Sequence, residues 1–290
     1  MSTRQPWTAE SLAEAPAEAV IRGQHLKLDE LLNPKLRDGA YLHGLHEQLL
    51  AASPFPYLVV EDWFNPVLLR LVRDEFHSGP ELPWSTEINR YARVERSRDH
   101  ARLGPASQLY FNALHSAFFL DVLFQVSGIA GLVADPHLVG GGLHETENGG
   151  SFGIHTDFDR HPHTALNNEM VLITYLNDHW QPEWNGALEL WDAQAHACVR
   201  QIEPRFGRSV LLTHGAAHFH GHPTPLSVPP GITRRSLAAY FYANRFARED
   251  RRPAMLSRFM FTTRGDRVRH ALEQWLPPVL VRWLKGMRRS

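Results

Sequence analysis

The spacing of hydrophobic and polar residues up to about residue 137 is typical of helices that bury one face. It predicts helices over residues 33–53, 65–79 and 104–128, and a strand over residues 55–63. In the last helix, apolar residues recur at intervals of three and four and form one continuous face, made of Leu109, Ala113, Ala117, Leu120 and Phe124. We therefore expect a helical region ahead of the rest of the fold.

The first two predicted helices begin with the same signal. Asn33-Pro34 and Asn65-Pro66 each place an asparagine, which can cap a helix, before a proline that suits the first helical position. Gly79 is expected to end the second helix, because glycine readily adopts the left-handed conformation found at helix C-termini.

After residue 137 the pattern changes to short runs of strand composition separated by Gly, Asn, Asp and Pro. About eight such runs follow without a helical pattern between them, which favours a sandwich or barrel over a parallel sheet with crossover helices. They cover residues 137–150, 151–158, 170–178, 186–193, 197–204, 209–215, 218–223 and 234–244. We expect a mainly β fold with flanking helices (α+β) and a jelly-roll core.

These patterns divide the chain into four segments. Residues 1–55 form an N-terminal helical extension, residues 56–136 a helical support region with its own first strand, and residues 137–245 the catalytic core. Residues 246–290 form a basic helical tail. We expect the tail to pack on the barrel or on a second subunit of a homodimer, and contact with a membrane surface or another partner is the alternative.

Composition excludes several classes of protein. The net charge of −1 over 290 residues implies no general attraction to nucleic acid. No segment approaches the roughly 20 apolar residues of a transmembrane helix, and the first residues lack a secretory signal, so we expect a cytoplasmic protein. The single cysteine, Cys198, excludes an internal disulfide framework, and its place in a predicted strand favours a buried or half-buried thiol.

A candidate metal site begins in the sequence "IHTDFDRH". On a strand, residues i and i+2 point to the same side, so His155 and Asp157 can present an imidazole and a carboxylate to one point. The pair alone is weak support, because His-x-Asp occurs often by chance. A third ligand is available in "THGAAHFHGHPTPL", which holds His214, His218, His220 and His222. Two histidines and one carboxylate form the facial set of non-haem Fe(II) oxygenases, which leaves positions open for a cosubstrate and dioxygen.

An arginine in the last predicted strand suggests an anion site. In "GITRRSLAAYFY", an arginine that points into an apolar barrel must pair with an anion, because an unpaired buried charge is costly. Its planar fork fits a carboxylate with two hydrogen bonds. The carboxylate can belong to the protein or to a dicarboxylic cosubstrate.

The ordered phrases "H-T-D … F-H-G-H-P … T-R-R-S" resemble the iron(II)/2-oxoglutarate-dependent dioxygenase superfamily, and its prolyl 4-hydroxylase-like branch most closely. The resemblance covers residues 55–245 and implies a double-stranded β-helix core. It implies that His155 and Asp157 are the first two iron ligands and that His220 is the third, with His218 and His222 as alternatives on the same strand face.

The resemblance also implies a cosubstrate site. Arg234 matches the basic residue that binds the far carboxylate of 2-oxoglutarate, and Tyr175 matches a tyrosine that donates a hydrogen bond to it. Ser236, Ala238 and Tyr240 would face the barrel interior beside Arg234, while Arg235 would point to solvent or to another chain. The turn Asn185-Gly186-Ala187 departs from the two glycines that are frequent in the family.

The implied activity is hydroxylation of an unactivated C–H bond. The resemblance implies Fe(II), O2 and 2-oxoglutarate, with ascorbate as an optional addition and with succinate and CO2 as coproducts. The substrate is a prolyl or amino-acid-like group of a peptide, or a small molecule. Two alternatives stay open: a cupin-like metalloenzyme that does not use 2-oxoglutarate, and a non-catalytic jelly-roll binding module.

Several other polar and aromatic residues have a less specific interpretation. A solvated loop is the expectation for His161 and His163, and His144 and Glu145 could reach the surroundings of the metal. Ordinary surface charge is favoured over a substrate lid for the arginines of "EINRYARVERSRDH", which are Arg90, Arg93, Arg96 and Arg98. Trp84 and Trp191 are expected in the core.

Overall fold

The computed structural model describes residues 17–78, 84–88, 92–97, 99–244 and 258–260. Gly79, Arg90, Arg98 and nearly all of the predicted basic tail lie outside the described residues.

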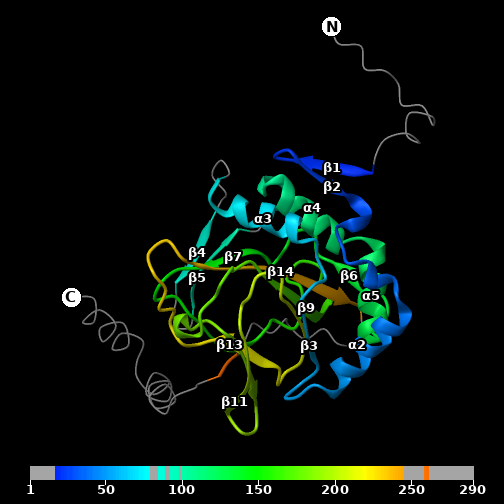
Figure 1. Cartoon of the computed structure of the whole chain (residues 1–290). Coiled ribbons are helices and arrows are strands. Elements are labelled where there is room, and N and C mark those ends of the chain that lie inside the picture. The colour runs from blue at the N-terminus through cyan, green and yellow to red at the C-terminus, as the bar shows by residue number, and fades with distance from the viewer. Residues whose placement is uncertain (1–16, 79–83, 89–91, 98, 245–257, 261–290) are drawn as a thin grey trace, which may run out of the picture.

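Two antiparallel sheets form the core of the fold (Figure 1). The larger sheet has eight strands in the order β3-β12-β9-β14-β7-β5-β4, with β6 paired to β14, and the smaller has five in the order β11-β10-β13-β8-β15. The bounds in the larger sheet are β3 Tyr57–Val60, β4 Ser85–Ile88, β5 Arg93–Ser97, β6 Val133–Ala134, β7 Gly142–Thr146, β9 Asn167–Tyr175, β12 Ser209–Thr213 and β14 Arg234–Ala243. Those in the smaller sheet are β8 Phe152–Thr156, β10 Leu188–Asp192, β11 Ala197–Ile202, β13 Phe219–His222 and β15 Arg258–Phe259.

The predicted β core is confirmed, because each of the eight predicted runs contains one strand. Four α-helices accompany it in the described part of the chain: α2 Gly39–Ala51, α3 Pro66–Ser78, α4 Pro105–Leu114 and α5 Ala117–Ser127. A hairpin of β1 Glu18–Ile21 and β2 Gln24–Lys27 precedes them. Short 3-10 helices complete the described elements: η1 Leu28–Glu30, η2 Pro34–Arg37, η3 His100–Arg102 and η4 Pro182–Trp184.

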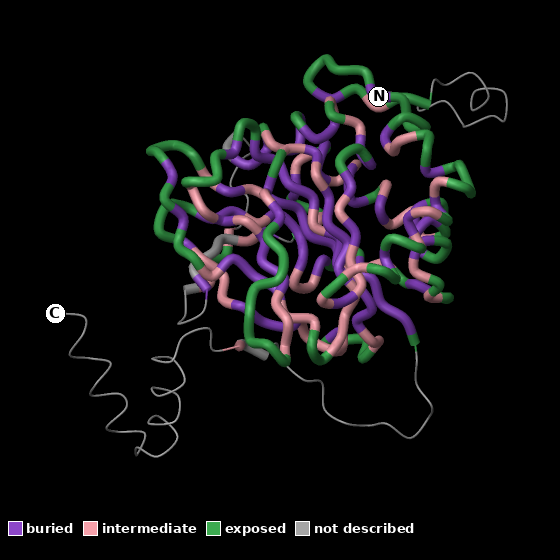
Figure 2. The backbone as a smooth tube through the Cα atoms, turned by 60° about the horizontal axis from the view of Figure 1, so that its bottom comes forward, coloured by how far each residue is buried: buried purple, intermediate pink, exposed green. Residues whose placement is uncertain are grey.

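Strand alternation gives the larger sheet two different faces. On β14, Leu237 and Phe241 pack into a hydrophobic cluster with the helices, whereas Ala238 packs with the inward residues of the smaller sheet. The same alternation on β9 puts Leu172 toward the helices and Val171 toward the second sheet. Figure 2 shows the buried residues concentrated in the central strands, with exposed residues around them. One face of the large sheet is therefore covered by helices, and the other faces the interior between the sheets.

Two predicted helices are divided by local capping. Residues 104–128 form α4 and α5, which are bent by 50°. The Ser116 hydroxyl accepts a hydrogen bond from the Phe119 N–H and caps α5, so the serine overrides the continuous apolar spacing. Residues 33–53 form η2, capped by Asn33 as predicted, and then α2, capped by Asp38.

Membrane-spanning potential is limited in the described residues. No single helix there is long and apolar enough to cross a bilayer, and only the bent α4–α5 pair reaches that length and hydropathy when taken together.

The expectation for Cys198 is wrong. Its thiol is exposed, because β11 is the edge strand of the smaller sheet and residues 197–201 are all exposed.

A buried carboxylate joins α3 to α4. Glu75, 2% exposed, accepts hydrogen bonds from the Ala106 N–H at 2.7 Å, the Ser107 N–H at 2.8 Å and the Ser107 hydroxyl at 2.6 Å. The first backbone N–H groups of a helix have no partner within the helix, and a negative charge at this end is favourable. Glu75 thus fixes α4 on α3.

We expect Glu75→Ala to lower the free energy of unfolding by about 3 kcal/mol, because it leaves buried donors at the start of α4 without an acceptor. Asp74→Ala is the matched control on the same helix, since Asp74 is exposed and contacts Arg73, and it should cost less than about 1 kcal/mol. Urea denaturation of both variants measures the difference. Equal midpoints would contradict the role given to Glu75.

Candidate active site

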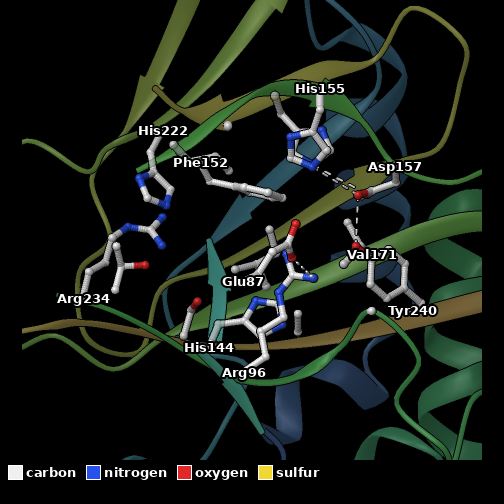
Figure 3. A pocket seen from close by; sticks show the side chains of 18 of the residues that line it. Glu87, Arg96, His144, Phe152, His155, Asp157, Val171, His222, Arg234 and Tyr240 are labelled. Atoms are coloured by element: carbon white, nitrogen blue, oxygen red, sulfur yellow. Dashed lines mark hydrogen bonds and ion pairs between the residues drawn. The ribbon is translucent and has the colours of Figure 1, made fainter. Parts of the chain in front are cut away.

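Two paired strands of the smaller sheet bring together two histidines and an aspartate, of which Figure 3 labels His155 and Asp157. His155 lies on β8 directly opposite His220 on β13, and Asp157 follows the last residue of β8. One ligand atom from each of the three residues lies within 4.8 Å of the others. The Nε2 atom of His155 is 3.5 Å from Asp157 Oδ1, and that of His220 is 3.6 Å from Asp157 Oδ2. The three side chains predicted as metal ligands therefore converge on one point.

The hydrogen bonds behind the two imidazoles favour metal binding. Nδ1 of His155 lies 2.8 Å from the Gly153 carbonyl oxygen, and Nδ1 of His220 lies 3.2 Å from that of His218. Each Nδ1 can therefore carry the proton, which leaves the Nε2 lone pairs directed at Asp157. Burial lowers the pKa of His220 to about 4, so this ring is neutral near pH 7. Two neutral nitrogens and one carboxylate fit the donor set that Fe(II) takes in oxygenases.

Tyr240 orients the carboxylate of this group. Its hydroxyl donates a hydrogen bond to Asp157 Oδ1 at 3.0 Å. Burial, with a further contribution from Asp157, raises the pKa of Tyr240 well above its usual value, so the phenol keeps its proton. Burial alone would also raise the pKa of Asp157, but the neighbouring His220 and His155 outweigh it and lower that pKa.

We expect Tyr240→Phe to weaken Fe(II) binding about 10-fold, because partners that orient a metal ligand are commonly worth 10- to 100-fold in affinity. Tyr242→Phe is the control on the same strand, since the buried Tyr242 hydroxyl has no hydrogen-bond partner among the residues described. Anaerobic Fe(II) titration of both variants provides the comparison, and equal affinities would count against an orienting role.

Arg234 is a buried residue that donates hydrogen bonds to two uncharged groups. It is 6% exposed, its Nε donates to the Gly186 carbonyl at 2.7 Å, and its Nη2 donates to the Tyr175 hydroxyl at 3.3 Å. Within the described part of the chain, no carboxylate forms an ion pair with Arg234. Burial lowers the pKa of Arg234 and raises that of Tyr175. A buried guanidinium without a counter-ion is suited to an anionic ligand.

The turn before β10 supports Arg234. Asn185 and Gly186 both have positive φ, at 62° and 75°. A Cβ at position 186 would come within 3.1 Å of Arg234 Cδ and 2.5 Å of Leu226 Cδ2, so glycine is required there. Asn185 has a ψ of −154°, outside the left-handed helical region, and its side-chain amide donates to the Pro225 carbonyl at 3.0 Å. One asparagine and one glycine are thus enough for this turn.

A cavity of about 450 Å³ joins the two groups. His155, Asp157, His220, Arg234, Tyr175, Ser236, Ala238 and Tyr240 all line it, so the inward face predicted for β14 is confirmed. Of the two alternative ligands, His222 lines the cavity, and its buried Nδ1 has no hydrogen-bond partner in the described residues. His218 lies outside the cavity wall, where it stacks on Phe55 at 4.6 Å and contacts the Thr213 carbonyl.

The sequence interpretation is wrong for Arg96. It lines the cavity, where Nη1 contacts Glu87 Oε2 at 3.0 Å and the guanidinium lies 5.3 Å from the centroid of the Phe152 ring. Glu87 also lines the cavity, although the sequence did not single it out as a site residue. Alternating residues of a hairpin over β4 and β5 would have indicated that these side chains face the interior. The structure shows this hairpin, in which β4 pairs with β5 and β5 pairs with β7.

Three further expectations are corrected by tertiary contacts. Arg235 does not point freely to solvent: its Nε donates to Glu145 Oε1 at 3.0 Å, and its guanidinium lies 5.6 Å from the Phe76 ring on the helical side. Glu145 consequently faces away from the metal ligands. His161 is buried, with Nε2 3.4 Å from Asp135 Oδ2, rather than solvated.

The remaining residues are distributed as follows. His163 is exposed, and His144 lines the cavity with its pKa lowered to about 3, mainly by burial and further by Arg96. Trp84 and Trp191 are half-buried: Trp84 contacts Phe76, and the Trp191 indole N–H donates to Glu189.

Comparison with known proteins shows a similarity that includes the strands of this site. The family described as the 2OG-Fe(II) oxygenase superfamily matches residues 141–242. A Pseudomonas putida prolyl-4-hydroxylase is similar at a TM-score of 0.52 and 16% identity, with 70% of this chain and 99% of that chain covered. A Trichoplax adhaerens prolyl hydroxylase, solved with a hypoxia inducible factor peptide fragment, has a TM-score of 0.54 at 15% identity over 74% and 95% of the two chains. No curated protein matches by sequence. The two structural similarities establish a shared fold.

Proposed function

We propose that this chain, a 2-oxoglutarate-dependent hydroxylase of the 2OG-Fe(II) oxygenase superfamily, binds Fe(II) through His155, Asp157 and His220 and oxidises a C–H bond of an amino-acid-like substrate. The observation that carries the proposal is the presence of two complementary groups in one cavity. A set of two histidines and one aspartate lines the same space as a buried arginine that has no carboxylate partner among the described residues.

Arg234 and Tyr175 are proposed to hold the far carboxylate of 2-oxoglutarate. Nη2 of Arg234 and the protonated phenol of Tyr175 can both donate to a carboxylate between them, and the Gly186 carbonyl fixes the guanidinium through Nε. Ser236 lies one inward position farther along β14 and adds a hydroxyl to the same wall. When bound, Fe(II) with 2-oxoglutarate and O2 supplies the oxidising chemistry, with succinate and CO2 as coproducts.

The chain's own residues define where oxidation occurs. Tyr240 holds the Asp157 carboxylate in place, and apolar side chains of both sheets exclude water from the interior between them. The prolyl hydroxylases with the same fold support an amino-acid-like substrate. We assign the metal and cosubstrate sites to the 137–245 core, while residues 56–136 support it and supply Glu87 and Arg96 to the cavity wall.

An anaerobic titration tests the proposal. Fe(II) followed by 2-oxoglutarate should produce a weak visible charge-transfer band in the wild type, which His155→Ala should abolish. Iron binding without a band would favour a cupin-like enzyme that does not use 2-oxoglutarate. Absence of tight Fe(II) binding would favour a non-catalytic binding module.

A further inference from the structure

A half-buried ion pair occupies the cavity wall beside the proposed metal site. The β4–β5 hairpin extends the larger sheet through β5, where Arg96 pairs in register with His144 of β7. This register turns Arg96 and Glu87 into the cavity, and Figure 3 shows both below His155 and Asp157 and apart from Arg234. The side chains are 23% and 35% exposed, respectively. The pair therefore lies on a wall that the proposed cosubstrate site does not use.

Arg96 is fixed close to the reacting centre. Its guanidinium lies 5.3 Å from the Phe152 ring centroid, and that ring lies 4.2 Å from the His155 ring. One aromatic ring thus separates Arg96 from a proposed iron ligand. Nη1 is bound to Glu87, but Nε is buried and has no hydrogen-bond partner among the described residues. The Arg96 side chain is nevertheless 23% exposed and lines the cavity, so a ligand there can reach it.

The charges of the occupied cavity restrict the substrate. Under the proposed function, the two charges of Fe(II) cancel those of the two 2-oxoglutarate carboxylates, and Asp157 cancels Arg234. Among the described residues that line the cavity, Arg96 and Glu87 form an ion pair, and burial lowers the pKa of His144 to about 3, which keeps that ring uncharged. A substrate with net charge would bring an uncompensated charge into a half-buried site, which is costly. The charges of the described lining residues therefore favour a substrate with no net charge.

We propose that Arg96 and Glu87 bind the α-carboxylate and the α-ammonium group of a free amino acid, whose side chain is thereby placed at the metal ligands. A zwitterion that inserts at this ion pair gives each charged residue an oppositely charged partner. An uncharged peptide amide offers neither residue a charged partner. Hydrogen bonds between charged groups are roughly twice as strong as those between neutral groups, so the free amino acid is favoured. The cavity of about 450 Å³ is at the small end of ligand sites, and the cosubstrate takes part of it. This inference rests on the proposed function.

Binding of blocked and unblocked amino acids provides the test. The wild type, loaded anaerobically with Fe(II) and 2-oxoglutarate, is titrated with each standard free L-amino acid and with its N-acetyl and carboxamide forms. We expect at least one free amino acid to shift the visible band, and blocking either end should weaken its binding about ten- to a hundred-fold. Succinate release is measured in parallel.

Two variants identify which residue binds the carboxylate of the amino acid and which binds its ammonium group. In Arg96→Gln the free acid and its carboxamide should bind equally, and in Glu87→Gln the free amine and its N-acetyl form should bind equally. Arg235→Gln is the matched control, because it breaks an Arg–Glu pair on the helical side of the sheet and should leave both preferences intact. Formation of the band in each variant reports an intact cosubstrate site.

The possible results are distinct. If the band forms and no free amino acid shifts it, or if doubly blocked peptides bind as tightly as free amino acids, the zwitterion site is wrong. If Arg96→Gln and Arg235→Gln show the same preference for the free acid over its carboxamide, Arg96 does not bind the carboxylate. If the wild type forms no band with 2-oxoglutarate, the proposed function fails instead.

Discussion

Asp157→Ala is expected to reduce Fe(II) affinity by more than about 100-fold, which is the upper range for loss of a group that only supports a metal ligand. Asp157 supplies the single carboxylate of the proposed set and is the point on which both histidine Nε2 atoms converge. Its removal leaves two neutral nitrogens and no anionic donor for the ion. Anaerobic Fe(II) titration measures the loss directly, without a known substrate.

Asp159→Ala is the control for this prediction. Asp159 lies two residues farther along the same loop and does not line the cavity, so its loss should leave Fe(II) affinity within about two-fold. If Asp157→Ala retains the affinity of the wild type, the three residues are not the metal site.

Arg234→Lys is expected to weaken 2-oxoglutarate binding about ten- to a hundred-fold, even though it conserves the charge. Lysine lacks both the planar fork and the Nε atom that binds the Gly186 carbonyl, so it can neither form two parallel bonds to a carboxylate nor keep the same anchor. Titration of the visible band with 2-oxoglutarate, in the presence of Fe(II), gives the affinity.

The neighbouring arginine makes a close control for that substitution. Arg235→Lys changes the same residue type one position along β14, but on the face that contacts Glu145 and Phe76. It should leave 2-oxoglutarate affinity unchanged. Equal losses in the two variants would mean that the effect arises from β14 as a whole rather than from an anion site.

The local pattern of the sequence was sufficient for β3 and the eight core strands, but not for β4, β5, β6 and β15. Runs of apolar residues bounded by Gly, Pro, Asn and Asp predicted the eight core strands, and the two-residue period placed Arg234, Ser236 and Tyr240 on one wall. The sequence also predicted the three side chains that converge. The strand period did not distinguish His220 from His222, and the choice of His220 rested on the family resemblance.

Features that depend on distant partners could not be predicted in this way. Arg96 looks like a surface charge until β5 pairs with β7, and His161 looks solvated until Asp135, far earlier in the chain, reaches it. The break between α4 and α5 shows the opposite limit. There a single hydroxyl, that of Ser116, outweighs a continuous apolar face. Periodicity reports which face is apolar, but not which neighbour will cover a polar group.

The two faces of the large sheet also separate folding stability from substrate choice. The larger hydrophobic cluster lies between the helices and the sheet, where Glu75 fixes α4, whereas Glu87 and Arg96 belong to a hairpin at the end of that sheet. Replacing the hairpin residues therefore removes few contacts from that cluster. This arrangement makes the hairpin a natural target for laboratory evolution, in which new specificities can be selected with little cost in thermal stability.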